Sequence, residues 1–424
     1  MSSDSFAEAA EQAPNSQSES SGTLSRRALL GGAAAGAGLA VGVGATLLGT
    51  GGTDKAVSIT TANSGSTVPF YGYHQAGIAT TPPSSILFAA YDVTTSQVSE
   101  LAELLRTWTT AAGQLCSGQI VDSDDSGETI GLPPSSLTLT FGFGPGIFDE
   151  RFGLAARAPE NFGPLPAFNG QQLDLASSGG DLMVQACAED QMTAFHAVRQ
   201  LDRLAVGTAN ERWGLAGFGA SAEVHNRETP RNLLGFKDGT ANPKPGTKAF
   251  DSTVWLGERD SPDWMRGGTY LCVRRIRTNL FAWDDLTPAD QEVVIGREKL
   301  SGAPLSGGNE FSPLNFATVG PDGVPAIPLD SHVRLASDTF DGGATMLRRG
   351  YSYDNGGDTM NGIRDSGMLF LAYVRDIEAQ FVPIQRQLAD SDRMNPFVTH
   401  IGTATFAVPP GVGHGTWIGQ SLFA

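Results

Sequence analysis

Runs of apolar residues predict an ordered series of strands and helices in the first half of the chain. The stretch 86–93, apolar except for Asp92, predicts a buried strand. Apolar residues three and four positions apart over 96–112 predict an amphipathic helix, with Ser96 as its N-terminal cap. The remaining patterns predict strands over 137–143 and 181–188 and a helix over 190–204. The order is therefore strand, helix, strand, strand, helix.

The second half of the chain follows the same theme. Its patterns predict strands over 269–276, 346–353 and 368–374, a helix over 375–388 and a glycine-rich loop over 301–313. No convincing sequence repeat relates the halves. Two α+β halves, each an antiparallel sheet with helices on one face, fit this order of elements.

The N-terminal segment differs in composition from the rest. Residues 1–22 are rich in Ser, Ala, Glu and Gln, which predicts disorder. Arg26 and Arg27 then precede an uncharged Gly, Ala, Leu and Val stretch that runs to about residue 52. A membrane anchor is one reading, since about 20 apolar residues span a bilayer. The weak hydropathy favours a twin-arginine export signal within residues 1–56, a periplasmic or extracellular protein, and no stable membrane span after cleavage.

Charge and cysteine content argue against several classes of protein. The formal net charge of -17 disfavours nucleic acid or an anionic membrane as a partner. The cysteines lie far apart, at Cys116, Cys187 and Cys272, and form no Cys-x-x-Cys pair. This disfavours thiolate zinc, iron–sulfur and covalently attached haem sites. Three buried free thiols are the favoured interpretation, and one disulfide stays open as the alternative.

The stretch 235–243, Gly-Phe-Lys-Asp-Gly-Thr-Ala-Asn-Pro, places a carboxylate in a constrained loop. Gly235 and Gly239 permit backbone angles that other residues avoid, and Asn242 is pushed toward extended geometry by the proline after it. Such a loop holds the Asp238 side chain in one direction. The Asp-Gly dipeptide alone would indicate only a surface turn.

The whole nine-residue stretch closely resembles the signature loop of dye-decolourising peroxidases, which are haem enzymes with a catalytic aspartate. Residues 329–336 match the family's proximal-histidine segment, and residues 346–353 match its arginine segment. The resemblance covers nearly everything after about residue 65. It implies two ferredoxin-like halves, residues 57–228 and 229–424, in a dimeric α+β barrel-like fold that holds one haem b per chain in the second half.

The resemblance assigns roles to three residues around this haem. His332 is implied as the axial ligand of the iron, although a lone histidine is more often structural, as we expect for His196. Asp238 would move a proton between the two peroxide oxygens, and Arg348 would stabilise negative charge as the O–O bond breaks. Because neighbouring strand residues point to opposite faces, Arg349 should face solvent or pair with an acid.

Further haem contacts carry over from the same family pattern. Asp392 is the expected carboxylate partner of the ligand histidine, with Asp390 as a nearby rival. The resemblance also implies contacts at Gly239, Thr240, Ala241 and Asn242, a propionate contact at Arg334, and contacts at Ser337, Asp338 and Thr339. The last three replace the Asn-Pro-Arg of many relatives. An arginine is therefore expected to be missing from the haem edge.

These residues predict a haem peroxidase that reduces hydrogen peroxide and oxidises bulky phenolic or dye-like compounds by one-electron steps. Its partners would be peroxide and an organic reductant; the sequence leaves open an oligomer and an iron or copper transport partner. The alternative is a deferrochelatase-like protein that releases iron from haem in an iron uptake system, and a third reading is a non-haem metal site at His332. Electron relay to large substrates is a hypothesis for Trp283, Tyr351, Tyr353 and Trp417.

Overall fold

The computed structural model describes residues 67–219, 229–260, 262–340, 342–357 and 364–424. The chain divides into one unit at Met1–Ser58 and another at Ile59–Ala424, and all the described residues belong to the second unit. The predicted tail and export signal, and the predicted boundary after residue 228, lie outside the described residues. No described helix combines the length and the apolar character that a membrane crossing requires.

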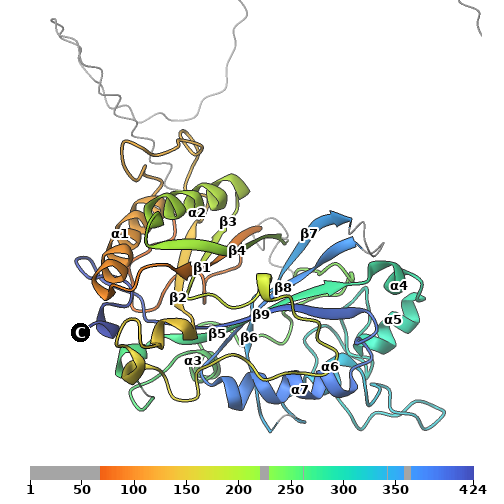
Figure 1. Cartoon of the computed structure of the whole chain (residues 1–424). Helices are drawn as coiled ribbons and strands as arrows, with labels where there is room; N and C mark the ends of the chain where they lie inside the picture. The colour runs from red at the N-terminus through yellow and green to blue at the C-terminus, as the bar shows by residue number, and fades with distance from the viewer. Residues whose placement is uncertain (1–66, 220–228, 261, 341, 358–363) are drawn as a thin grey trace, which may run out of the picture. The chain divides into compact units, whose positions relative to one another are not determined.

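The first half forms a four-stranded antiparallel sheet with two helices on one face (Figure 1). Its elements are β1 (Ser85–Val93), α1 (Val98–Cys116), β2 (Thr138–Phe143), β3 (Leu182–Ala188), α2 (Gln191–Ala205) and β4 (Ala209–Phe218). The strands lie in the order β2-β3-β1-β4, which is the ferredoxin-like arrangement. The predicted strands and helices are confirmed. Strand β4 was not predicted, because charged residues and glycines dilute its apolar alternation.

The second half has the same strand connectivity. Its elements are α3 (Lys248–Val254), β5 (Thr269–Thr278), α4 (Leu280–Asp284), α5 (Pro288–Ile295), α6 (His332–Leu335), β6 (Leu347–Arg348), β7 (Tyr351–Gly357), β8 (Arg364–Val374), α7 (Val382–Ser391) and β9 (Val398–Val408). Its long strands lie in the order β9-β5-β8-β7, so each half places its fourth strand beside its first. A π-helical turn, Ile377–Phe381, precedes α7 where the sequence predicts one continuous helix. Short 3₁₀ turns lie at Pro145–Phe148, Ala155–Arg157, Leu175–Ser177, Asp263–Met265 and Gln420–Leu422.

Two edge contacts join the sheets into a closed barrel. Phe143 in β2 pairs with Ala407 in β9, and Phe218 in β4 pairs with Ser352 in β7. Strands β5 and β8 also pair along their length, so the long strands of both halves form one ring. The α+β, barrel-like fold with two ferredoxin-like halves is confirmed, and the dimer stays a prediction.

Apolar side chains fill the inside of the ring and the space beneath the helices of the first half. Inside the ring, Phe88 and Phe406 are fully buried. On the outer face of the first sheet, α1 buries Leu105 and Trp108. Helix formation here follows from the apolar stripe of α1, since its exposed face carries the polar residues. The favoured interpretation of the cysteines is also confirmed, because all three are free and buried.

Two local predictions were wrong in detail. The N-terminal cap of α1 is Gln97, not Ser96, and Gln97 makes no side-chain capping bond. Thr95 accepts a hydrogen bond from the Gln97 amide at 3.0 Å, just before the helix begins. Val98, the first residue of the helix, lies within the predicted amphipathic stretch but is 41% exposed.

Residues 346–353 form β6 and β7, which pair with β8 in one continuous register. Side chains therefore alternate as predicted, with Arg348 on the outer face and Arg349 inside the ring. Arg349 is 3% exposed and donates from Nη1 to the carbonyl of Thr80 at 2.5 Å. The expectation that it faces solvent or pairs with an acid was wrong: the opposite face of this sheet is the barrel interior, and no described carboxylate bonds Arg349.

Candidate active site

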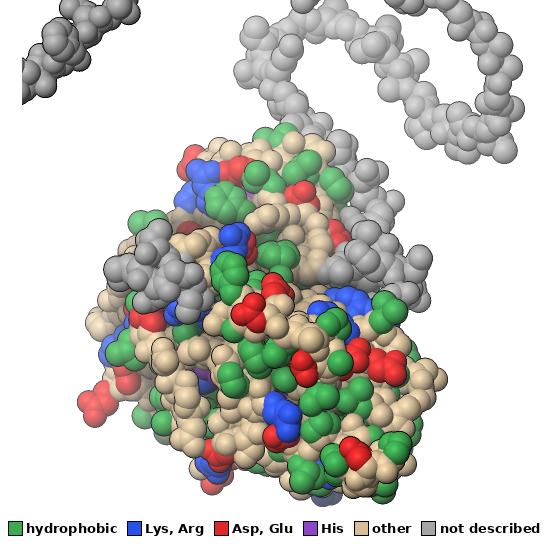
Figure 2. Space-filling view, turned by 90° about the vertical axis from the view of Figure 1, so that its right-hand side faces the viewer, with side chains coloured by type: hydrophobic (Ala, Val, Ile, Leu, Met, Phe, Trp, Pro, Cys, Tyr) green, Lys and Arg blue, Asp and Glu red, His purple; other side chains and the backbone are tan. Residues whose placement is uncertain are grey.

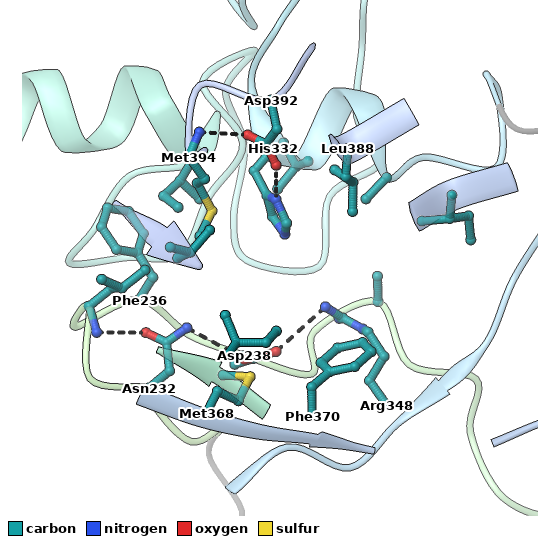
Figure 3. A pocket seen from close by; sticks show the side chains of 18 of the residues that line it. Asn232, Phe236, Asp238, His332, Arg348, Met368, Phe370, Leu388, Asp392 and Met394 are labelled. Atoms are coloured by element: carbon teal, nitrogen blue, oxygen red, sulfur yellow. Dashed lines mark hydrogen bonds and ion pairs between the residues drawn. The ribbon is translucent and has the colours of Figure 1, made fainter. Parts of the chain in front are cut away.

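A cavity of about 380 Å³ lies in the second half, between the outer face of its sheet and the layer that carries α6 and α7 (Figure 3). Its size is typical of a small-molecule or cofactor site. Most of its lining is apolar, with Leu234, Phe236, Ile276, Ile295, Val333, Met346, Met368, Phe370, Phe381, Ile384, Leu388 and Met394. Such an enclosure strengthens electrostatic interactions among the few charged groups that face it.

Asp238 and Arg348 meet on one wall of this cavity (Figure 3). Asp238 Oδ1 lies 3.5 Å from Arg348 Nη1, and Asn232 Nδ2 donates to Asp238 Oδ2 at 3.4 Å. The Arg348 and Asp238 side chains are 28% and 27% exposed, so their charged ends reach the cavity. Asn242 stands behind them and bonds the backbone N–H and carbonyl of Arg348 at 3.1 and 2.7 Å. Asn242 therefore fixes the arginine strand against the aspartate loop.

The loop that carries Asp238 is held by a buried acid. Gly239 adopts a positive φ of 114°, as the sequence leads us to expect. Lys237 Nζ lies 2.5 Å from Glu310 Oε2, and Thr240 Oγ1 donates to Glu310 Oε1 at 3.1 Å. Burial raises the pKa of Glu310, but its hydrogen bonds, first that of Lys237, outweigh burial and leave the pKa below its ordinary value. An ionised Glu310 thus anchors the loop at neutral pH.

His332 faces the same cavity from the opposite wall. It begins the one-turn helix α6, and its Nδ1 lies 2.6 Å from Asp392 Oδ2. Asp392 is 6% exposed and also accepts from the Met394 amide at 2.8 Å, so its orientation is fixed. With Nδ1 donating to this carboxylate, Nε2 keeps the lone pair that a metal ion needs. Figure 3 shows the ring pointing across the cavity toward the side of Asp238.

Asp392 also changes the pKa of His332. Burial lowers the pKa of the imidazole, but the charge and hydrogen bond of Asp392 outweigh burial and raise the pKa above its ordinary value. Asp390, the rival of Asp392, instead accepts from Asn169 Nδ2 at 2.6 Å. The structure therefore brings Asp392, and not Asp390, to the expected ligand.

Most of the other expected haem contacts also lie at the cavity. Among the expected contacts, those that line the cavity are Gly239, Thr240, Ala241, Ser337 and Asp338. Thr339 does not line it, and Asn242 lies one layer behind, on the backbone of Arg348.

Arg334 does not line the cavity, although a propionate contact was expected there. Its guanidinium lies 4.9 and 5.1 Å from the ring centroids of Phe316 and Phe340 and donates to the carbonyl of Ile327 at 3.1 Å. The reason is helical geometry, because each residue turns the side-chain direction by about 100°. Residues two apart on a helix point about 200° apart, so His332 and Arg334 cannot face the same cavity.

The cavity is also lined by two basic residues that the sequence analysis did not single out, Arg297 and His400. Arg297 donates from Nη1 to the carbonyls of Gly302 and Glu310 at 2.8 and 2.9 Å. Burial lowers the pKa of Arg297 below its ordinary value. No local motif marks either residue, because Arg297 lies two positions beyond the end of α5 and His400 lies on β9, a strand that was not predicted.

The four aromatic residues suggested as an electron relay are spread over the structure. Trp283 is buried and packs edge-on against Phe236, a lining residue, with ring centroids 6.0 Å apart. Tyr351 and Tyr353 belong to the apolar cluster inside the ring, and Trp417 belongs to the cluster under the first-half helices. Trp283 therefore contacts the cavity wall, and the relay itself stays a prediction.

These groups fit a haem. A free imidazole nitrogen on one wall, an acid and a guanidinium on the other, and apolar side chains between them suit an axially ligated tetrapyrrole. A non-haem metal site has less support, because the described part of the chain brings together no group of three or more His, Cys, Asp or Glu that could hold an ion.

Comparisons with known proteins show which family the chain resembles. Residues 75–219 match the family model "Dyp-type peroxidase, N-terminal", and residues 229–413 match "Dyp-type peroxidase, C-terminal". The chain is 41% identical to a dye-decolorizing peroxidase of Thermobifida fusca over 76% of this chain and 75% of the relative. It is 37% identical to a deferrochelatase of Escherichia coli over 81% of this chain and 84% of the relative.

Solved structures show the same similarity. The chain superposes on ferric DtpA from Streptomyces lividans with a TM-score of 0.81 and 40% identity, covering 84% of this chain and 97% of that one. A DyP-type peroxidase from Streptomyces coelicolor gives a TM-score of 0.81 and 40% identity, covering 84% of this chain and 96% of that one.

Proposed function

The chain belongs to the Dyp-type peroxidase family and is a haem peroxidase, and we propose that it holds one haem b, reduces hydrogen peroxide and oxidises bulky phenolic or dye-like reductants by one-electron steps. The observation that carries this proposal is the position of His332 opposite Asp238 and Arg348 across one cavity. The three residues come from a helix, a loop and a strand that are far apart in the sequence.

Bound haem would supply an iron that takes up peroxide and holds its oxidising equivalents. His332 would hold this iron through Nε2. Asp392, 2.6 Å from Nδ1, would fix the orientation of the ring and increase the electron donation of the ligand.

Asp238 would move the proton. Its carboxylate would accept the proton of the peroxide oxygen nearer the iron. It would then give this proton to the oxygen farther from the iron, which leaves as water. Arg348, 3.5 Å from Asp238 Oδ1, supplies a permanent positive charge where negative charge develops as the O–O bond breaks. Asn232, which donates to the other carboxylate oxygen, would keep Asp238 aimed at the peroxide.

The space that haem would leave bears on where a bulky reductant could react. A haem bound in the cavity of about 380 Å³ would leave little space beside Asp238, which suits peroxide better than a dye molecule. A bulky reductant would then give up its electrons at the surface, and Trp283, packed against Phe236 on the cavity wall, offers a path inward.

The surface of the second half suits an aromatic reductant. Apolar side chains lie interspersed with charged side chains of both signs on the face that carries α4 and α5 (Figure 2). Those more than half exposed in this half include Phe281, Leu300, Phe311, Val319, Val324 and Leu329. These side chains offer apolar contacts to an aromatic reductant that docks on this face.

Spectroscopy and dye oxidation test the proposal. The purified protein should show a Soret band and should decolourise an anthraquinone dye only when peroxide is added. Arg348→Leu should lower the rate of the peroxide reaction about 10²- to 10³-fold, because it removes the charge that stabilises O–O cleavage. Arg364→Leu is the matched control, since Arg364 is an exposed arginine that pairs with Asp354. Equal peroxide rates in wild type and Arg348→Leu would overturn the assignment.

A second candidate activity is iron release from haem, because one relative is a deferrochelatase. In this reaction two protons would replace the iron and the tetrapyrrole would stay intact. Incubation of the haem-loaded protein with a reductant and a ferrous chelator tests it by mass spectrometry of the extracted pigment. Metal-free protoporphyrin in amounts equal to the chelated iron would support it, whereas unchanged haem would count against it.

Export by the twin-arginine route is proposed from Arg26, Arg27 and the mildly apolar stretch after them. The prediction is that Arg26→Lys with Arg27→Lys keeps the protein inside an expressing bacterium. Fractionation measures this, and the unchanged chain should reach the periplasm or the medium. Equal export of both chains would contradict the proposal.

A further inference from the structure

A fully buried arginine lies directly behind the wall of the cavity. Arg274 is 0% exposed, and its guanidinium donates to His400 Nδ1 at 3.1 Å, to Thr403 Oγ1 at 3.0 Å and to Gln171 Oε1 at 3.0 Å. The ring of Phe168 covers it, with its centroid 5.5 Å away. None of these partners is an acid. A buried cation without a carboxylate is costly, so this site gains from a nearby anion.

His400 connects this cation to the cavity. Ile276 in β5 pairs with Met368 in β8 and with His400 in β9, so the three side chains form one row on one face of the sheet. All three line the cavity, and Figure 3 shows Met368 on the Asp238 side of it. Arg274 lies on the same face, two residues before Ile276. His400 is therefore the member of this row that stands between the buried guanidinium and the space of the cavity.

The contact with Arg274 fixes the tautomer of His400. An arginine Nε–H can only donate, so Nδ1 of His400 must accept and the ring proton must lie on Nε2. Burial and the charge of Arg274 lower the pKa of His400 to about 3, which keeps the ring neutral at ordinary pH. No described group bonds Nε2. The cavity wall thus presents a neutral N–H donor backed by an uncompensated positive charge.

A donor of this kind selects a carboxylate. A neutral imidazole gives a directed hydrogen bond, and the charge behind it favours an anionic acceptor over a neutral one. The two faces of a bound tetrapyrrole would meet other residues, since His332 approaches from α6 and Asp238 and Arg348 from the opposite wall. His400 would therefore meet the edge of a bound tetrapyrrole and not its iron, and the acidic groups at that edge are the propionates.

We propose that His400 donates a hydrogen bond from Nε2 to a propionate of the bound haem, with Arg274 as the positioning residue that orients His400 and supplies the charge. This inference rests on the haem site of the proposed function. His400 would then provide the propionate contact that was expected of Arg334, whose guanidinium lies against Phe316 and Phe340 instead.

The test is the rate of haem loss to excess apomyoglobin, which needs no turnover. His400→Asn keeps an acceptor close to the position of Nδ1 for Arg274 but removes the donor at Nε2, and His400→Gln places a donor close to Nε2. Each protein is loaded either with haemin or with haemin dimethyl ester, in which the propionates carry no charge. Haemin loss from His400→Asn should be about 10- to 100-fold faster than from wild type, whereas loss of the ester should be unchanged. His400→Gln should stay close to wild type with both ligands.

Arg274→Gln removes the cation and should reproduce the haemin-specific loss. His414→Asn, which changes an exposed histidine, is the control and should behave as wild type. Equal acceleration for haemin and its ester would overturn the proposal, because His400 would then act only through packing. An unchanged loss of haemin would also overturn it, as would a raised KM for an anionic dye without faster haem loss. Absence of a Soret band in wild type mixed with haemin would instead contradict the haem site itself.

Discussion

The two halves of the molecule share one strand connectivity, but the outer face of the sheet is covered differently in each half. In the first half, Leu139 and Ala186 are fully buried in one apolar cluster with α1 and α2. In the second half, the outer face presents His400, Ile276 and Met368 to a cavity. The same ferredoxin-like frame therefore supports direct helix packing in one case and a ligand site in the other.

The difference arises in the crossover connections. The first connection of the first half carries α1, a helix of 19 residues that lies across its sheet. The matching connection of the second half carries α4, α5 and α6, with 5, 8 and 4 residues. Such short helices do not cover the sheet, and α6 holds His332 away from it. The cavity thus follows from how the chain is routed and not from a different sheet.

The largest difference between the two halves is expected when one aspartate in each half is replaced and the rate of the peroxide reaction is measured. Asp238→Asn should lower the rate of the peroxide reaction about 10²- to 10⁴-fold, because it removes the proton acceptor. Asp202→Asn, in α2, should leave that rate unchanged, since Asp202 only accepts a hydrogen bond from the Tyr91 hydroxyl at 2.7 Å. Stopped-flow mixing with peroxide measures both. A large loss in Asp202→Asn would show that the first half takes part in the chemistry.

A matched pair of leucines should show the difference in packing. Leu201→Ala, at a fully buried site in α2, should lower the free energy of unfolding by about 3 to 4 kcal/mol. Leu388→Ala, on the cavity wall in α7, should cost about 1 to 2 kcal/mol in haem-free protein, because part of that side chain already faces empty space. Urea unfolding measures both values. Equal losses would mean that the cavity closes in solution.

A pair of aspartates near the end of α7 should show how local the site is. Asp392→Asn should weaken haem iron binding about 10- to 100-fold, because it removes the carboxylate that orients His332. Asp390→Asn should have little effect, since among the described residues Asp390 bonds Asn169 and not His332. Haem titration followed at the Soret band measures the affinities. The same loss in both variants would point to a general charge effect.

His196, which is buried, and His400, which is half-buried at the cavity, should give the smallest difference, in the pH dependence of stability. Burial and Arg274 lower the pKa of His400 from 6.5 to about 3. Burial also lowers the pKa of His196, but the charge of Asp125 opposes that shift. A lowered folded-state pKa means that the unfolded chain binds the proton more tightly, so stability is lost as pH falls below about 6.5.

The expected result is a fall in Tm below pH 6.5 that is shallower in His400→Gln than in wild type. His196→Gln should give a smaller change in slope, because Asp125 already offsets part of the burial. Thermal unfolding of haem-free protein between pH 4 and pH 8 measures both slopes. A steeper fall in His400→Gln would contradict the sign of the shift.

The sequence by itself determined the local elements and the identity of the central residues. Apolar periodicity located most strands and both long helices of the first half, because side-chain direction repeats along a regular backbone. The loop at 235–243 and the segments around His332 and Arg348 were found because each is a contiguous motif. Alternation along residues 346–353 also predicted correctly that Arg348 and Arg349 point to opposite faces.

Only the tertiary structure decided what each face meets. Hydrophobic periodicity does not show that the sheet face opposite Arg348 is the interior of a barrel. Closure of the barrel depends on pairing between strands of different halves. The choice of Asp392 over Asp390, and the contact of Arg274 with Gln171, join residues 60 and 103 positions apart. A local pattern fixes the direction of a side chain relative to its own backbone, whereas its partner is set by distant segments that pack against it.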